Sequence, residues 1–177
     1  CVGMFLLGGV FSAQFGMSAV YGAEVGLSVA QISTFVATIF IGAMVTQYPI
    51  GWLSDRMDRR ALIGITAVIG GMGAIVGIMA ENDFTLILVA AFMMGGTSNP
   101  LYSLLLAHTN DFLEHEDMAA ASGGLIFING LGAVGGPLLT GWMMGVFGPS
   151  GFYMILVVLF AGLALYAGYR ATQRATI

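Results

Sequence analysis

Charged residues are scarce in this sequence: Asp, Glu, Lys and Arg together make up 8% of its 177 residues. Soluble domains contain about 25% charged residues, whereas 58% of this chain is hydrophobic. A soluble protein of this size could not cover so much apolar surface with polar side chains. The composition therefore predicts an integral membrane protein that has the lipid bilayer as its solvent.

Cysteine is scarce as well, and the sequence motifs of enzyme active sites are missing. Cys1 is the only cysteine, which excludes a disulfide within the chain and a cysteine-based metal cluster. The five basic residues form no patch of the kind that binds nucleic acid. The sequence shows no nucleophile–base pair, no metal-ligand spacing and no phosphate-binding loop. We therefore expect no catalytic residues, no metal, no cofactor and no nucleic-acid partner.

Long apolar segments, by contrast, dominate the chain. A helix needs about 20 mostly apolar residues to cross a bilayer, and these segments are too long and too evenly apolar for barrel strands. Ser28 and Gln31 have the spacing of a capping box, which predicts the start of the second helix there. The six predicted spans cover about residues 2–23, 30–53, 61–80, 84–108, 118–146 and 151–169.

The arginines predict how these spans are oriented. Arg56, Arg59 and Arg60 lie between the second and third spans, and Arg170 and Arg174 follow the sixth. With six spans, both places are on the same side of the membrane, and segments rich in Lys and Arg face the cytoplasm. We therefore expect the Arg-rich loop and the C-terminus to be cytoplasmic, in the inner membrane of a bacterium.

Residues 51–60, here called the signature loop, carry a family resemblance. They resemble the Gly-x-Leu-Ala/Ser-Asp-Arg-x-Gly-Arg-Arg/Lys loop of the major facilitator superfamily, which lies between the second and third helices of a six-helix half. Asp58 departs from the pattern, which has glycine there. The resemblance implies an all-α membrane fold of six transmembrane helices, arranged as two inverted three-helix repeats. The matching residues are Gly51, Leu53, Ser54, Asp55, Arg56, Arg59 and Arg60.

The resemblance also implies a gating role for this loop. Asp55 is expected beside a helix N-terminus of the opposite half, where the positive end of the helix dipole favours a carboxylate. Arg59 is expected to pair with an acidic residue at the cytoplasmic end of the fourth span, and Asp111 is placed for that. The alternative is that these are solvated loop charges.

Complete members of the family have twelve or more helices, so the chain resembles one half, and more closely a C-terminal half. The expected partner is the other six-helix half, either in the same polypeptide or as a second copy.

Glycine is abundant, with 27 residues, as expected where helices pack closely in a bilayer. Gly132, Gly136 and Pro137 resemble the glycine–proline pattern of the family's fifth helix, which is associated there with antiporters. Close packing with a bend at Pro137 is the alternative explanation. Pro100 in the fourth span is predicted to kink a gating helix.

In this family the first, second, fourth and fifth helices of a half line the central cavity. Polar side chains gather in those spans of this chain, although Ser and Thr can also bond their own backbone and Asn a neighbouring helix. No charged residue or histidine lies near the middle of a span, so any proton or ion coupling would use the other half. The candidate cavity residues are Gln14, Ser18, Tyr21, Thr38, Asn99, Tyr102 and Asn129.

The sequence thus favours one half of a secondary transporter that moves a small solute by alternating access. It does not indicate the solute. Two alternatives stay open: a non-transporting assembly factor or sensor on the same scaffold, and a six-helix half that dimerises.

Overall fold

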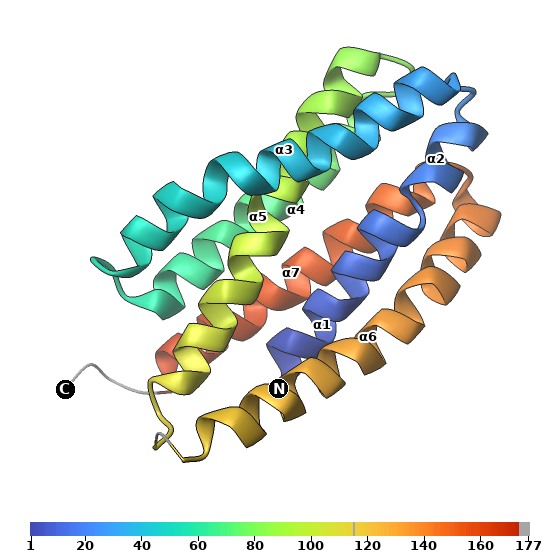
Figure 1. Ribbon diagram of the computed structural model, residues 1–177. Helices are drawn as coiled ribbons and strands as arrows, with labels where there is room; N and C mark the ends of the chain where they lie inside the picture. Colours follow the sequence, from blue (N-terminus) through green and yellow to red (C-terminus); the bar gives the residue numbers. More distant parts are fainter. Residues whose placement is uncertain (115, 174–177) are drawn as a thin grey trace.

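The computed structural model describes residues 1–114 and 116–173, and these form helices and connecting loops without a strand (Figure 1). Five of the helices are long and apolar enough to cross a membrane, and a bent pair at the start makes a sixth candidate span. The elements are α1 (Val2–Phe11), the π-helical turn η1 (Ser12–Gly16), α2 (Ser18–Glu24), α3 (Val29–Ser54), α4 (Arg59–Met79), α5 (Phe84–Asn110), α6 (Met118–Phe147) and α7 (Gly151–Thr172).

The first expected span, residues 2–23, is not one straight helix. It consists of α1, η1 and α2, and the axis bends by 47° between Gly16 and Ser18. No proline causes the bend. A π turn holds one extra residue per turn and is a known cause of helix kinks, as are neighbouring Gly and Ser residues.

Side-chain caps define where the longer helices begin. Ser28 and Gln31 form the predicted capping box of α3, with the Ser28 N–H donating to Gln31 Oε1 at 2.9 Å and the Gln31 N–H donating to Ser28 Oγ at 3.3 Å. Asp58 caps α4 and Asp83 caps α5 in the same manner, by accepting from backbone N–H groups. These caps explain why the helix starts are well defined in otherwise uniform apolar sequence.

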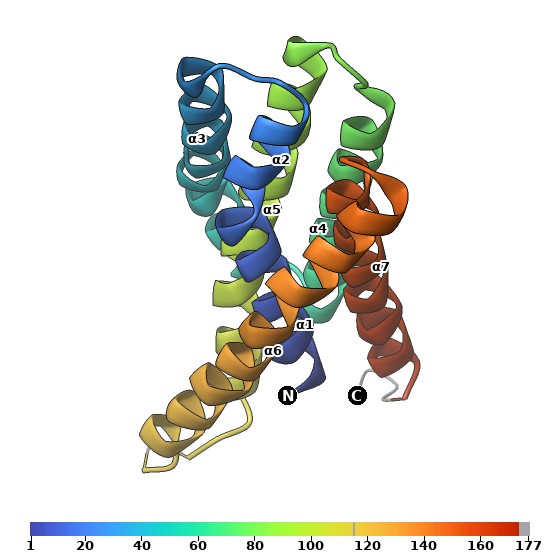
Figure 2. The same ribbon diagram turned by 90° about the vertical axis from the view of Figure 1, so that its right-hand side faces the viewer.

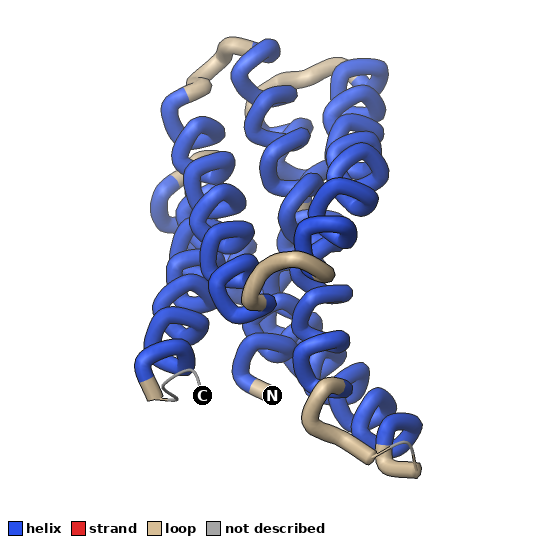
Figure 3. Tube along the Cα trace, turned by 90° about the vertical axis from the view of Figure 1, so that its left-hand side faces the viewer, coloured by secondary structure: helices blue, strands red, loops and turns tan. Residues whose placement is uncertain are grey.

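The helices pack in an antiparallel bundle in which the start of α1 and the end of α7 lie at the same end (Figures 2 and 3). α3 packs against α5, α5 against α4, α4 against α7, and α7 and α6 against α1. An aromatic cluster closes the opposite end of the bundle: the rings of Tyr21 and Phe152 stack 4.9 Å apart, and Tyr153 and Phe35 complete it. This cluster joins α2, α3 and α7.

Two helix pairs approach each other closely enough to require glycine. A methyl group added at Gly132 in α6 would collide with the carbonyl oxygen of Phe5 in α1, and one added at Gly42 in α3 would collide with that of Phe92 in α5. Both contacts bring backbone against backbone, as small residues allow in membrane helices.

The six-helix bundle leaves α3 and α6 largely uncovered. Only 17% of the apolar stretch of α3 and 11% of that of α6 is buried, against 44%, 56% and 50% for α4, α5 and α7. Many large apolar side chains on α3 and α6 are exposed, among them Met44, Tyr48, Val134 and Leu138.

Candidate functional site

The signature loop is a tight connection between α3, which ends at Ser54, and α4, which begins at Arg59. Asp58 stands where the family pattern has glycine. Its φ is −60°, a value open to any residue, and its Oδ1 accepts the backbone N–H of Arg60 at 2.9 Å. The departure from the pattern therefore leaves the turn intact and gives α4 an N-cap.

Arg59 joins the ends of three helices. Its Nη1 donates to both carboxylate oxygens of Asp111 at the end of α5, and its Nε donates to Ser54 Oγ at the end of α3, at 3.2 Å. The contact between Arg59 and Asp111 that the resemblance implies is thus present in the structure. The side chains are 27% and 45% exposed, so the pair contributes about 1 kcal/mol or less to folding.

Asp55 differs from its neighbours in having no partner. It is exposed and forms no ion pair or side-chain hydrogen bond within residues 1–114 and 116–173. Arg56 instead lies over the Trp52 ring, 3.8 Å from its centroid, and donates to the Trp52 carbonyl oxygen at 3.3 Å. Gly51 is exposed, with open space where a side chain would begin. The carboxylate of Asp55 is therefore available to a group outside the described part of the chain.

A groove of about 290 Å³ lies beside the loop, between α3 and α5. Asp55 and Arg59 border it on one side and Pro100 on the other. Across it, Gln47 Nε2 donates to Ser103 Oγ at 2.9 Å. Gln47 was not predicted for this site, and Ser54 was named only as a match to the loop pattern. Their spacing with Gly51 places all three on one face of a helix, which is the signal that could have found them.

The first-span candidates Gln14, Ser18 and Tyr21 lie inside the bundle. Their side chains are 0%, 1% and 2% exposed, so in this conformation they do not face an open cavity. Tyr21 belongs to the aromatic cluster. Gln14 lies in the π turn, and neither of its amide atoms, nor the Ser18 hydroxyl, has a hydrogen-bond partner among the described residues.

The candidates on α3 and α6 bond to backbone. Thr38 Oγ1 donates to the carbonyl oxygen of Thr34, one turn earlier in its own helix, at 2.7 Å. Asn129 Nδ2 donates to the Met4 carbonyl oxygen at 3.0 Å and so ties α6 to α1. Both side chains remain partly exposed.

On α5, Asn99 and Tyr102 are also partly exposed, and the Tyr102 ring lies 6.0 Å from that of Phe11. Pro100 is buried between them, and α5 continues as an α-helix through it. Pro137 lies inside α6, which is likewise uninterrupted. The break that the structure does contain is in the first span.

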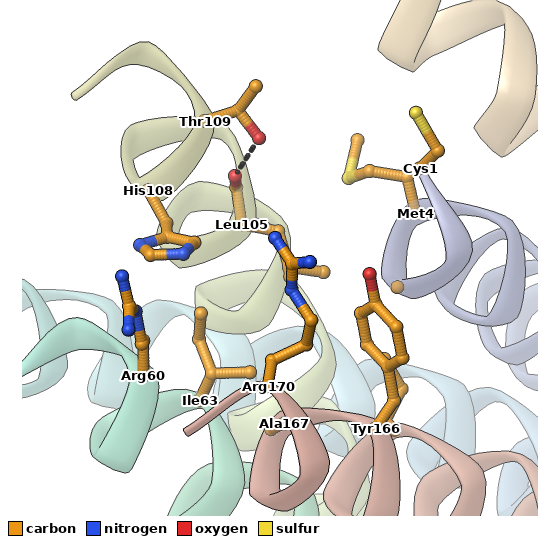
Figure 4. Close-up of a pocket in the computed structure, with 12 residues that line it drawn as sticks. Cys1, Met4, Arg60, Ile63, Leu105, His108, Thr109, Tyr166, Ala167 and Arg170 are labelled. Atoms are coloured by element: carbon orange, nitrogen blue, oxygen red, sulfur yellow. Dashed lines mark hydrogen bonds between the residues drawn. The ribbon is translucent and has the colours of Figure 1, made fainter. Parts of the chain in front are cut away.

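Two glycines of α6 pack closely against the first span. Gly132 faces the Phe5 carbonyl, and a methyl group on Gly136 would collide with the Ser12 hydroxyl. Close contact with α1 therefore accounts for both glycines. Arg60 lies away from the signature groove, in a separate pocket with His108 and Arg170 (Figure 4). No three His, Cys, Asp or Glu side chains of the described residues are grouped so as to hold a metal.

The chain is similar to known proteins in both sequence and fold. The family model described as Major Facilitator Superfamily matches residues 1–176. The "Uncharacterized MFS-type transporter YcaD" of Escherichia coli O139:H28 (strain E24377A / ETEC) is 26% identical over 154 residues, which cover 87% of this chain and 39% of that protein. The protein of the same name from Escherichia coli (strain K12 / DH10B) matches to the same extent.

A solved structure has the same fold. The crystal structure of an auto inhibited POT family peptide transporter superimposes with a TM-score of 0.77 at 16% sequence identity, covering 99% of this chain and 38% of that one. The chain thus spans about two fifths of the length of these proteins, 39% and 38% respectively.

Proposed function

The chain belongs to the major facilitator superfamily, and from this we propose that it supplies one six-helix half of a secondary transporter for a small solute. The observation that supports this most is the signature loop. Arg59 fixes the ends of α3, α4 and α5 relative to one another, and Asp55 is left projecting without a partner. A rigid platform with one free carboxylate suits a gate that closes against a helix end of another half.

The half is proposed to be the C-terminal one, with its partner either in the same polypeptide or in a second copy. The small buried share of α3 and α6 supports a partner, because these two helices leave the most surface to cover. The signature loop and the C-terminus are proposed to face the cytoplasm of a bacterial inner membrane. Arg56, Arg59, Arg60 and Arg170 support this; Arg174 lies outside the described residues.

We further propose two inverted three-helix repeats, the first running to the end of α4 and the second from α5 to α7. Matched backbone contacts support this. Gly8 in α1 meets the carbonyl oxygen of Asn129 in α6, and Gly95 in α5 meets that of Ile39 in α3. The Gly132–Phe5 and Gly42–Phe92 contacts form a second matched pair between the same helices. Each of these two contacts of α1 with α6 thus has a counterpart between α5 and α3, as a two-fold relation requires.

The transport pathway is proposed to run along the partly exposed polar side chains Thr38, Asn99, Tyr102 and Asn129. The bend of the first span would be the moving part. Gln14 supports this, because a buried amide without partners is costly and π turns are frequent at functional sites. Alternating access then follows from rocking of two halves about this path.

Uptake by proteoliposomes that contain the full-length protein tests the proposal. A panel of sugars, amino acids, peptides, organic anions and cationic drugs would be offered under an imposed proton gradient. We expect accumulation of at least one class above the level of protein-free liposomes. If no compound moves and the protein copurifies with a stable complex of other proteins, the scaffold serves assembly or sensing and the transport proposal is wrong.

A further inference from the structure

A second polar site lies at the end of the bundle where α1 begins and α7 ends. There α1, α4, α5 and α7 surround a pocket of about 110 Å³, several times the volume that one water molecule needs. Arg60 of α4 and Arg170 and Tyr166 of α7 point their polar ends in the same direction from its floor (Figure 4). His108 of α5 borders it as well.

The two arginines of this pocket have no carboxylate partner within the described residues. Asp111 instead pairs with Arg59 of the signature loop. Asp58 accepts from the backbone N–H of Arg60, not from its guanidinium. Asp58 and Asp111 do lie within electrostatic range of His108, but each is held by these other contacts. Two guanidinium groups at one pocket are suited to a phosphate, which each can bind through two parallel hydrogen bonds.

An apolar groove continues from this pocket along the outer face of α4 and α7. Arg60 and Ala167 line both the pocket and the first part of the groove, which has a volume of about 570 Å³. Val68, Met72 and Ala164 line both this part and a second one of about 340 Å³. The groove is therefore continuous from the basic end to the middle of the two helices.

The groove is long enough for one lipid chain. It runs from Arg60 to Ile75, which at about 1.5 Å per residue is roughly 22 Å, whereas one leaflet of the hydrocarbon core is about 15 Å deep. Small residues form its floor, and Gly168 leaves open space where a side chain would begin.

We propose that this is a binding site for one anionic phospholipid, with the phosphate at Arg60 and Arg170 and an acyl chain in the α4–α7 groove. A lipid combines the two features that the site offers, an anion at one end and an apolar chain of membrane length beyond it. Basic pockets between helices on the cytoplasmic side are a known setting for anionic headgroups. The leaflet assignment rests on the proposed orientation, whereas the binding itself does not depend on transport.

Native mass spectrometry of the full-length, delipidated protein in detergent tests this site. Phosphatidylglycerol and phosphatidylcholine with the same acyl chains would be titrated, and we expect tighter binding of phosphatidylglycerol. Arg170→Gln should weaken it roughly fivefold, and the Arg60→Gln, Arg170→Gln pair roughly 25-fold, since each basic residue near a membrane surface contributes comparably. Arg56→Gln removes the same charge elsewhere and should leave the affinity unchanged.

Filling the groove tests the acyl chain separately. Gly168→Leu places a side chain in open space and should fold, yet weaken phosphatidylglycerol binding several-fold; Gly145→Leu, an equally open glycine on α6, is the control. Glycerol 1-phosphate should not compete at the same concentration. Equal binding of both lipids, or effective competition by glycerol phosphate, would overturn the proposal. So would a Gly168→Leu variant that changes only the fraction of dimers, because the groove would then be an interface between copies.

Discussion

At the signature loop, neighbouring charged residues make different contacts. Arg59 bonds to Ser54 and Asp111, and Arg56 lies over the Trp52 ring. Asp55 is exposed and has no ion-pair or hydrogen-bond partner in the described chain. The pairing of Arg59 with Asp111 could be predicted because the loop pattern places Arg59 and the resemblance expects an acidic residue at the cytoplasmic end of the fourth span. The burial of Gln14 could not, because a π turn shifts the register of side chains without leaving a mark in the sequence.

The Arg59–Asp111 pair should affect transport far more than stability. Arg59→Ala and Asp111→Ala should each lower the free energy of unfolding by about 1 kcal/mol or less, since the pair is half exposed. Both should reduce transport, because the ends of α4 and α5 are no longer held together. A double-mutant cycle on initial uptake rates checks this. Purely additive losses would remove the pair from the gating model.

Asp55→Asn should lower transport about tenfold, if the free carboxylate stabilises one state through a helix dipole. The thermal unfolding temperature should not change, because Asp55 is exposed and makes no ion pair or side-chain hydrogen bond in the described chain. Asp58→Asn is the matched control. It removes the same charge three residues away but keeps a side-chain oxygen that can cap α4. Equal loss of uptake in both variants would show that loop charge alone matters.

At the scale of helices, the sequence located the apolar segments but not their irregularities. Hydrophobicity indicated where long apolar segments lie, because crossing a bilayer demands a minimum apolar length, and Ser28 marked the start of α3. The bend of the first span was missed, since an apolar run looks the same in an α and a π turn. Pro100 and Pro137 lie inside α5 and α6, which stay α-helical through them, so the kink at Pro100 and the alternative of a bend at Pro137 remain predictions. Neighbouring groups in membrane bundles can compensate for the missing proline N–H.

Two glycines of α6 should respond oppositely to the same substitution. Gly132→Ala should lower the free energy of unfolding by about 1–3 kcal/mol, because the new methyl group meets the Phe5 carbonyl. Gly130→Ala enters open space and should raise it by about 0.5–1 kcal/mol, the usual gain in a helix. Unfolding in SDS, followed by circular dichroism, measures both. A stabilised Gly132→Ala variant would contradict the close contact of α1 with α6.

At the scale of the whole molecule, the family and the membrane setting could be predicted, but the covered faces could not. Membrane helices are apolar all round, so their sequences do not separate lipid-facing from protein-facing sides. In this bundle, the packing shows which sides of the helices face protein. α4, α5 and α7 are about half buried, at 44%, 56% and 50%, while α3 and α6 are nearly bare.

Water access should distinguish α3 from α7 in the full-length protein. In a Cys1→Ser background, Thr38→Cys should react several-fold faster with a membrane-impermeant maleimide than Leu165→Cys. Leu165 is 75% exposed in the bundle and faces outward from α7, where lipid excludes the reagent. Thr38 lies on the proposed pathway. Mass spectrometry of the labelled protein gives both rates, and faster labelling at Leu165→Cys would place the pathway elsewhere.

The bare surfaces of α3 and α6 also bear on how the protein is made. A bundle inserted alone would present Thr38 and Asn129 to lipid until a partner covered them, and partly exposed polar groups in hydrocarbon mark unassembled membrane proteins. If this half follows the other along one polypeptide, the first half is already in the bilayer when the ribosome releases the second, and it can cover α3 and α6 at once. The order of the two halves in translation would then limit how long the newly inserted bundle is open to membrane proteases.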